Sequence, residues 1–410
     1  MERKRITVVI GTRPEAIKLA PLVLALRHQP QLCPVVVTTG QHPGVVDEVL
    51  GILGIVAGTD LGVGSIDLGV ADAGSGLDAT AAAVLARFGA LVRADRPAAV
   101  VVQGDTTSAF GAALAAFYQR IPVAHVEAGL RSGDRLAPFP EEVHRRTTAL
   151  LADLHFAPTP DAAARLVAEG VDPAAVHVTG NTVIDALHMI RGRHVPYRDP
   201  RLAALEAAGL AALEAGESAA LDAGQIAAPE AGAPARRRPV MLVTAHRRES
   251  WGQPMERMVC AIERIALARP ELVTVVSMHP NPLVRKAFAR LATLDNVLLA
   301  EPEPYGSFVR LMDLADVILT DSGGIQEEAP SLGTPVLVLR EVTERSEGVV
   351  AGVARLVGTD TDRIVAEVGR LLDCPGALAA MADPGDLYGD GTAAVRCVRA
   401  LAAHLGVTMT

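Results

Sequence analysis

The sequence is poor in lysine and in aromatic residues, and its charge composition limits the classes of partner that the protein can bind. Aromatic residues make up 3% of the 410 residues, and lysine occurs only at Lys4, Lys18 and Lys286. Acidic residues outnumber basic ones, which gives a formal net charge of −9 and a pI of about 5.7. The chain therefore lacks the basic surface that a nucleic-acid partner requires.

Cysteine is also scarce, and the spacing of its four occurrences fits no metal site. They are Cys33, Cys260, Cys374 and Cys397. We expect buried or incidental thiols of a reducing compartment and no bound metal. Long apolar runs are missing too. The N-terminal residues lead directly into a short predicted strand, so we expect no signal peptide and no transmembrane helix. The sequence predicts a cytoplasmic protein with no membrane partner.

Length and hydrophobicity predict two α/β domains. The chain is too long for one compact core, and its hydrophobic fraction of 50% is typical of soluble α/β proteins. A short apolar strand, a polar turn and a helix follow one another many times, which predicts parallel, doubly wound sheets. We expect Rossmann-like domains over residues 1–186 and 187–386, facing each other across a cleft.

Two stretches stand outside this pattern. Residues 200–238 are rich in Ala, Glu and Gly, and Ala203–Ala207 recurs as Ala211–Ala215. We expect a loosely ordered, partly helical insertion with no chemistry. The Gly-, Asp- and Ala-rich region from Gly51 to Asp78 allows no assignment.

The most informative stretch runs from Val317 to Glu328. Val317–Thr320 is predicted as a buried strand, followed by the polar turn of Asp321, Ser322, Gly323 and Gly324 and then a helix. Serine is a good N-cap residue, and the glycines let a ligand approach the backbone. The N–H groups of a helix start suit a phosphate. An ordinary strand-to-helix turn is the alternative.

The first strand, Ile6–Ile10, is followed by a similar turn that carries two cations. Only Gly11 is a glycine there, so the turn is not a dinucleotide fingerprint. Arg13 and Lys18 lie beside the predicted helix start, which favours an anionic ligand. The alternatives are a surface salt bridge for Arg13 and a solvated helix face for Lys18.

Three carboxylates follow later strands of the first domain. Asp105 follows the strand at 98–103, Glu127 lies at the tip of the next strand, and Glu141 begins a helix after Pro140. Asp105 could equally cap its helix. Ligands of open parallel sheets bind at the carboxyl ends of the strands. Carboxylates that share such a site push their pKa values apart, which yields an acid and a base.

The second domain adds polar residues at its own strand ends. His246 follows the strand at 240–244, His279 follows the strand at 273–278, and Arg345 lies in a polar loop after Val336–Leu339. A histidine satisfied by a local hydrogen bond is the alternative for His246. This combination suits a nucleotide sugar, with the second domain holding the diphosphate and the first acting on the sugar.

The motifs in these turns resemble those of the non-hydrolysing UDP-N-acetylglucosamine 2-epimerases. They occur in the family's order and span nearly the whole chain outside the insertion: Gly11–Lys18, Gly104–Thr107, His125–Arg131, Pro140–Glu142, His246–Glu249, Asp321–Pro330 and Thr343–Arg345. The resemblance implies a GT-B-like arrangement, a homodimer, and a C-terminal helix at about 387–410 that joins the first domain. It also implies interconversion of UDP-GlcNAc and UDP-ManNAc through a bound 2-acetamidoglucal, without metal or cofactor.

The resemblance also implies roles for residues at matching positions. Asp105, Glu127 and Glu141 are the expected acid/base group, with His246 assisting near the diphosphate. Arg13 and Lys18 are expected to contact phosphate. The expected UDP-binding residues are Ser322, Gly323, Gly324, Glu328 and Arg345, with Phe308 near uracil.

Departures from the family pattern fall where bacterial members bind UDP-GlcNAc as an activator. Pro43 follows Gln41 and His42 where arginine is usual, and residues 73–76 lack the arginine that many members carry. We expect Gln41, His42 and His279 to be remnants of that site and the requirement for activator to be weakened. A hydrolysing 2-epimerase, which releases ManNAc and UDP, and a GT-B glycosyltransferase remain alternatives.

Overall fold

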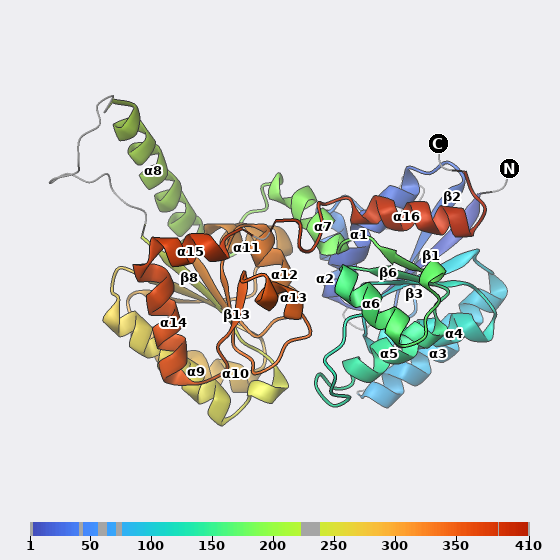
Figure 1. The fold of residues 1–410 in the computed structure, drawn as a ribbon, viewed down its shortest axis with the longest axis horizontal. Helices are drawn as coiled ribbons and strands as arrows, with labels where there is room; N and C mark the ends of the chain where they lie inside the picture. The colour runs from blue at the N-terminus through green and yellow to red at the C-terminus, as the bar shows by residue number, and fades with distance from the viewer. Residues whose placement is uncertain are drawn as a thin grey trace. The chain divides into compact units, whose positions relative to one another are not determined.

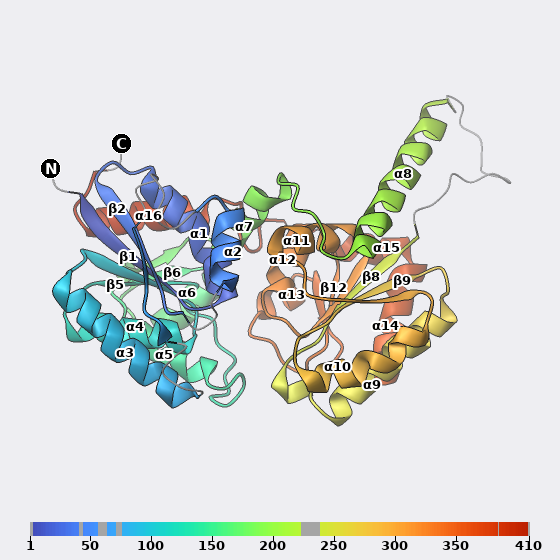
Figure 2. The ribbon, with the colours of Figure 1, turned by 180° about the vertical axis from the view of Figure 1, so that it is seen from behind.

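The computed structural model describes residues 3–40, 44–55, 64–70, 76–222, 238–383 and 385–408. The chain divides into two compact units. The first unit comprises Met1–Gly192 and Asp386–Thr410, and the second comprises Arg193–Gly385. Each unit is an α/β domain built on one sheet, and Figures 1 and 2 show the two sheets with helices on both faces.

The first unit contains a seven-stranded sheet in the order β3-β2-β1-β4-β5-β6-β7, in which neighbouring strands pair in parallel. Its strands are β1 (Lys4–Ile10), β2 (Leu32–Thr38), β3 (Gly64–Asp67), β4 (Ala99–Gln103), β5 (Val123–Val126), β6 (Leu154–Ala157) and β7 (Val176–Val178). Its helices are α1 (Arg13–Arg27), α2 (Val45–Ile52), α3 (Leu77–Ala94), α4 (Thr107–Tyr118), α5 (Glu141–Leu151), α6 (Pro160–Ala168), α7 (Thr182–Arg191) and α16 (Ala393–His404).

The second unit contains a six-stranded parallel sheet in the order β10-β9-β8-β11-β12-β13. Its strands are β8 (Val240–Thr244), β9 (Val273–Ser277), β10 (Val297–Ala300), β11 (Val317–Thr320), β12 (Val336–Val338) and β13 (Ala354–Leu356). Its helices are α8 (Pro200–Asp222), α9 (Gln253–Ala268), α10 (Pro282–Phe288), α11 (Tyr305–Leu314), α12 (Ile325–Ser331), α13 (Ser346–Val350), α14 (Thr361–Asp373) and α15 (Pro375–Met381).

The two sheets confirm the parallel α/β class, and buried strands explain why the sequence signal was strong. All five residues of β4 and all five of β8 are buried. Strands covered on both faces read as continuous apolar runs, which are easy to recognise. Strand β3 escaped recognition because Gly64-Ser-Ile-Asp67 has little strand propensity, and it forms by pairing with β2.

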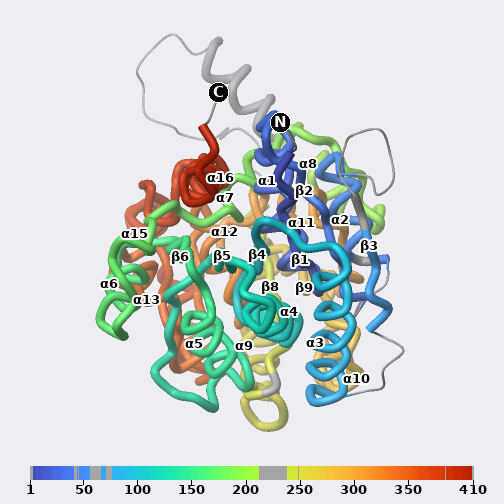
Figure 3. The backbone as a smooth tube through the Cα atoms, turned by 90° about the vertical axis from the view of Figure 1, so that its right-hand side faces the viewer, coloured from blue at the N-terminus to red at the C-terminus, as the bar shows by residue number. Residues whose placement is uncertain are grey.

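The C-terminal helix α16 packs in the first unit beside α1 and α7, as Figure 3 shows. The Asp185 carboxylate on α7 accepts hydrogen bonds from the backbone N–H groups of Ala393 (3.1 Å) and Ala394 (2.9 Å). These N–H groups have no partner within their own helix, so the buried carboxylate caps α16 and fixes its start against α7.

The insertion is more ordered at its start than the sequence suggested. Helix α8 begins at Pro200, and the buried Glu303 carboxylate holds the residues before it by accepting from the N–H groups of Arg198 (2.9 Å) and Asp199 (3.0 Å). The Arg310 guanidinium pairs with Glu206 on α8. Residues 223–237 lie outside the described part of the chain.

In the part of the chain that the structure describes, no helix is both long and apolar enough to cross a membrane.

Two buried histidines make folding stability depend on pH. His125 on β5 and His155 on β6 are register partners, and each imidazole is buried. Burial lowers the pKa of His125 to about 3 and that of His155 to about 4. Below about pH 6.5 the unfolded chain binds protons that the folded chain does not, so the free energy of unfolding falls by about 1.4 kcal/mol per pH unit for each histidine.

We therefore predict that His155→Gln weakens the loss of stability on acidification. Urea midpoints measured at pH 7 and pH 5 should differ less for the variant than for the wild type, because one of the two contributing imidazoles is gone. The change in urea midpoint between the two pH values is compared for the two proteins, so the contributions of groups that both proteins share cancel. One such group is Glu15, because burial raises its pKa to about 7 and its effect on stability has the opposite sign. Equal changes in midpoint for the two proteins would show that His155 is not buried in its neutral form.

Candidate functional site

Each sheet has one point where its strand order reverses, and several of the candidate residues lie in the turns that follow the strands at these points. In the first unit the reversal lies between β1 and β4, and in the second it lies between β8 and β11. Loops leave such neighbouring strands toward opposite faces of the sheet, so a crevice opens at the carboxyl ends of the strands. We refer to the two places as switch points.

Glu127, which follows β5, is buried and held by three polar side chains. Lys18 Nζ lies 2.5 Å from Glu127 Oε1, and Asn181 Nδ2 donates to the same oxygen at 3.2 Å. Gln103 Nε2 donates to the other oxygen. Glu127 has φ of 62°, a left-handed conformation that costs a non-glycine residue energy and is common at functional sites.

Lys18 lies on neither a solvated helix face nor an open surface. Its side chain is 7% exposed and its charge is paired with Glu127, a residue 109 positions away in the sequence. An uncompensated buried charge is strongly destabilising, so each of the two charges depends on the other. Arg13 is the first residue of α1, is half-buried, and precedes Pro14 in the first turn as the sequence predicted.

Asp105 does not cap helix α4, because the neighbouring residue Thr106 does. Thr106 Oγ1 accepts from the N–H of Ala109 at 3.0 Å. The Asp105 carboxylate instead accepts from Arg145 Nε at 2.9 Å and from the same guanidinium's Nη2. The sequence analysis did not identify Arg145. Its position one helical turn after Glu141 and Glu142 could have indicated an arginine that pairs with a nearby carboxylate.

Glu141 and Glu142 begin helix α5 and differ in their surroundings. Glu142 is fully buried, lies 3.4 Å from Arg145 Nη1, and accepts from the N–H of Ser132 at 3.0 Å. Glu141 Oε2 is also buried, but no hydrogen-bond donor contacts it among the described residues. Glu141 therefore presents a carboxylate oxygen with unused lone pairs.

In the second unit, Asp321 after β11 holds the turn after β8. Its carboxylate oxygen Oδ2 accepts from the N–H groups of His246 and Arg247, both at 2.8 Å, and Oδ1 lies 3.1 Å from His246 Nδ1. Burial acts to raise the pKa of Asp321, but His246 and the two N–H groups outweigh it, so this pKa lies below its ordinary value. Asp321 thus orients His246, a role that the sequence did not indicate.

The imidazoles of His246 and His279 stack with ring centroids 5.4 Å apart and planes 14° from parallel. Burial and the nearby His246 both lower the pKa of His279. Gln41 and His42, which were predicted alongside His279, lie outside the described residues.

The expectation that Ser322 caps the next helix was wrong. Helix α12 begins at Ile325 with Gly324 in the N-cap position and no side-chain cap. The N–H of Ser322 donates to Thr320 Oγ1 at 2.9 Å, and its carbonyl accepts from Gln326 Nε2 at 3.0 Å. The two glycines lengthen the turn, so Ser322 lies too far from the helix to cap it.

Arg345 is buried and fixed by two carboxylates. Its Nε donates to Glu327 Oε1 at 2.8 Å, and its Nη1 donates to Glu344. A Cβ atom on Gly323 would lie 2.6 Å from Arg345 Nη1, so only glycine lets the guanidinium lie against this turn. Glu328 is likewise buried and accepts from the Tyr305 hydroxyl at 2.9 Å, while Phe308 is half-buried on α11.

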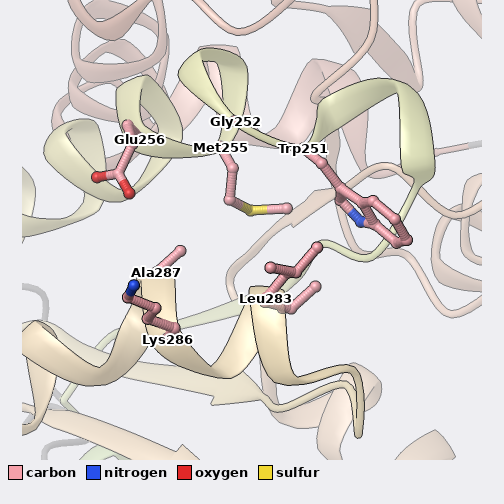
Figure 4. A pocket seen from close by; sticks show the side chains of 8 residues that line it. Trp251, Gly252, Met255, Glu256, Leu283, Lys286 and Ala287 are labelled. Atoms are coloured by element: carbon pink, nitrogen blue, oxygen red, sulfur yellow. The ribbon is translucent and has the colours of Figure 1, made fainter.

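A hollow elsewhere in the second unit contains none of the predicted site residues. Its volume is about 280 Å³, and Figure 4 shows its lining between the start of α9 and α10, where Trp251 and Met255 face Leu283. No cluster of three or more residues suited to a metal ion occurs in the described ranges.

Comparisons with known proteins agree with this arrangement. A family model described as UDP-N-acetylglucosamine 2-epimerase matches residues 24–402. The UDP-N-acetylglucosamine 2-epimerase of Salmonella typhimurium is 43% identical over 401 residues, which cover 98% of this chain and 99% of that protein.

Two solved structures extend the likeness to the fold. The UDP-GlcNAc 2-epimerase of Neisseria meningitidis bound to UDP-GlcNAc is 38% identical, with a TM-score of 0.83 over 97% of this chain and all of that one. An S. aureus MnaA–UDP structure is 37% identical, with a TM-score of 0.84 over 99% of this chain and 98% of that one. These neighbours confirm the GT-B-like fold class. With a family model that covers most of its length, the chain belongs to the UDP-N-acetylglucosamine 2-epimerase family, as its motifs predicted.

Proposed function

We propose that the chain interconverts UDP-N-acetylglucosamine and UDP-N-acetylmannosamine by epimerisation at C2 of the sugar. The observation that carries the proposal is the set of three carboxylates after neighbouring strands of the first sheet, Asp105, Glu127 and Glu141, in a chain of this family. Removal and return of a proton at C2 need acid and base groups, which carboxylates at one sheet edge can supply.

The proposed reaction is an elimination followed by an addition. A base removes the C2 proton, the C1–O bond to UDP breaks, and a C1–C2 double bond forms in a 2-acetamidoglucal. UDP then adds back at C1 while a proton returns to the other face of C2. The C2 proton is weakly acidic, so the base has to be close and shielded from water.

The contacts distinguish the three proposed acid/base groups. Both oxygens of Glu127 accept hydrogen bonds, and one oxygen of Asp105 accepts two from Arg145. Glu141 Oε2, which is buried without a donor among the described residues, is best placed to take a proton. Asp105 and Glu127, which are held in place by their hydrogen bonds, are then proposed to return the proton to the opposite face of C2 or to stabilise charge there.

The second unit is proposed to hold UDP. Departing diphosphate requires cations and N–H donors whose positions are already fixed. Arg345 has such a position because Glu327 and Glu344 hold its guanidinium, and the turn of Ser322, Gly323 and Gly324 offers backbone close by.

The remaining assignments complete the proposed UDP site. His246 assists near the diphosphate from the orientation that Asp321 gives it. Glu328 binds the UDP portion and Phe308 lies near uracil. Arg13 is proposed to contact phosphate, whereas Lys18, whose charge is paired with Glu127, acts through that carboxylate.

We propose that a second copy of the chain covers an apolar face of the first unit. Phe117, Tyr118 and Leu150 on helices α4 and α5 are 51%, 62% and 79% exposed. A hollow of about 560 Å³ lies at the end of α4 beside Phe117 and Tyr118. Exposed apolar groups that gather in this way mark association sites.

Sedimentation equilibrium is expected to give about twice the chain mass of 42.7 kDa. Leu150→Lys should shift the protein toward monomer, because it places a charge on the covered face, whereas Leu267→Lys, at an exposed leucine of the second unit, should not. A monomeric wild-type protein would contradict the dimer.

The activity itself is tested by proton NMR of the purified protein in D2O. With UDP-GlcNAc alone we expect UDP-ManNAc signals to grow and deuterium to enter C2. Free ManNAc with UDP would favour a hydrolysing enzyme, and an unchanged spectrum would favour a transferase or another sugar.

The same experiment started from UDP-ManNAc alone tests the proposed weak dependence on an activator. Because the arginine expected after His42 is replaced by Pro43, turnover should begin without a lag. A rate that stays at zero until UDP-GlcNAc is added would contradict this.

A further inference from the structure

Glu15 lies at the switch point of the first unit and contacts both turns that meet there. Its carboxylate oxygen Oε2 accepts from the N–H of Gly11 (2.9 Å) and the hydroxyl of Thr12 (2.8 Å), which belong to the turn after β1. Its other oxygen, Oε1, accepts from the hydroxyl of Thr106 (2.7 Å) in the turn after β4. The Glu15 side chain is fully buried.

A local role explains only part of this arrangement. Thr12 and Glu15 occupy the N-cap and N3 positions of α1, the spacing of a capping box, although the Thr12 side chain donates to Glu15 and caps no backbone N–H. That role accounts for the contacts with Gly11 and Thr12. It does not account for Thr106, which lies 91 positions away and on another strand's turn.

The contact with Thr106 connects two residues of the proposed site. Arg13 follows Thr12 directly, and Asp105 precedes Thr106 directly. The turn after β1 also lies against the start of α4, since a Cβ atom on Gly11 would lie 2.3 Å from Ser108 Oγ. A group that ties these turns together therefore sets the separation between the Arg13 and Asp105 backbones.

We propose that Glu15 is a positioning residue that holds the Asp105 turn against the Arg13 turn in the geometry that the epimerisation requires. This inference rests on the proposed function. Glu15 does not take part in proton transfer to the sugar; it acts through Thr106 on the placement of Asp105.

The ionised carboxylate is the form that accepts all of these hydrogen bonds. The Thr106 hydroxyl already accepts from the N–H of Ala109, so its single proton is the one donated to Glu15. A protonated Glu15 loses one acceptor position and weakens the contact. Burial raises the pKa of Glu15 to about 7, against the lowering effect of Thr106, Thr12 and Gly11, so the contact changes within the working pH range.

The elements that contact Glu15 also carry charged side chains. On α1 they are Arg13 and Lys18, and Lys18 pairs with Glu127. On the turn after β4 the charged group is Asp105, which pairs with Arg145 of α5. Burial raises the pKa of Glu15, and the hydrogen bonds that its carboxylate accepts oppose that rise.

The substitution Glu15→Gln separates the positioning role from the capping role. Glutamine keeps one acceptor oxygen, which retains the contacts with Gly11 and Thr12 at the helix start. With that oxygen at the helix start, its N–H₂ group faces Thr106, so the hydrogen bond that the Thr106 hydroxyl donates loses its acceptor. Thr106→Val removes the same contact from the other side, together with the α4 cap that Thr106 forms with Ala109, and Thr106→Ser keeps the hydroxyl and both contacts.

The measurement is kcat for UDP-GlcNAc epimerisation from pH 6 to pH 8.5 for the wild type and the three variants. At pH 8 we expect E15Q and T106V each to lower kcat by about 10- to 100-fold, since misplacing a reacting group by about 1 Å costs about 10²-fold. The KM should change less than kcat. T106S should stay within a few-fold of the wild type.

Three features of the result support positioning. The ratio of wild-type to E15Q kcat should fall toward one as the pH drops below 7, because protonated Glu15 and glutamine are equivalent. The E15Q/T106V double variant should be no slower than T106V, because E15Q removes only the Glu15–Thr106 contact, which T106V already lacks. Thr159→Ala, which removes a threonine cap of the same kind from α6, should lower the melting temperature without this pH-dependent ratio.

A ratio that is constant with pH, or single-variant effects that multiply in the double variant, would overturn the proposal. If E15Q does not fold by circular dichroism, T106V carries the same comparison with the carboxyl group in place. Wild-type protein without epimerase activity overturns the proposed function and this role with it, whereas an active wild type with a flat ratio overturns the role alone.

Discussion

In both units, a buried carboxylate connects the two polar turns that meet where the strand order reverses. Glu15 links the turns after β1 and β4, and Asp321 links the turns after β8 and β11. Turns at the ends of different strands have no shared hydrogen-bond ladder, so their separation depends on contacts of this kind. The residues proposed for chemistry lie next to these links: Arg13 and Asp105 in one unit, and His246 in the other.

The charges around these links are paired in the folded state. Lys18 with Glu127, and Arg345 with Glu327 and Glu344, are buried ion pairs. Such pairs contribute little net stability, because removing each charge from water costs about as much as the attraction returns. What they supply is position: Glu127 and Arg345 are held at defined places before any ligand arrives, which lowers the entropy that binding and reaction have to overcome.

Much of the fold and the general place of the site followed from the sequence, because parallel strands put their carboxyl ends at one sheet edge. Asp105, Glu127 and His246 could be placed there from strand boundaries alone. Their partners could not. Lys18 meets Glu127 across 109 residues, and Arg145 meets Asp105 across 40 residues. No local pattern encodes such contacts.

Local rules also failed where a turn was longer than expected. Ser322 has the right chemistry for an N-cap, yet Gly323 and Gly324 separate it from Ile325. Gly323 also leaves the room that the Arg345 guanidinium occupies, so the turn accommodates that side chain as well as the helix start. Glu15 shows the converse case, since its capping-box spacing is readable from sequence while its contact with Thr106 depends on the order of the strands.

A crystal structure with UDP tests most directly whether the Ser322–Gly324 turn of the second unit binds the nucleotide. We expect the diphosphate to lie against the backbone of Ser322–Gly324 and within hydrogen-bond distance of Arg345, with His246 still held by Asp321. UDP bound elsewhere, for example in the hollow beside Trp251 and Leu283, with the Ser322–Gly324 turn unoccupied, would contradict the account.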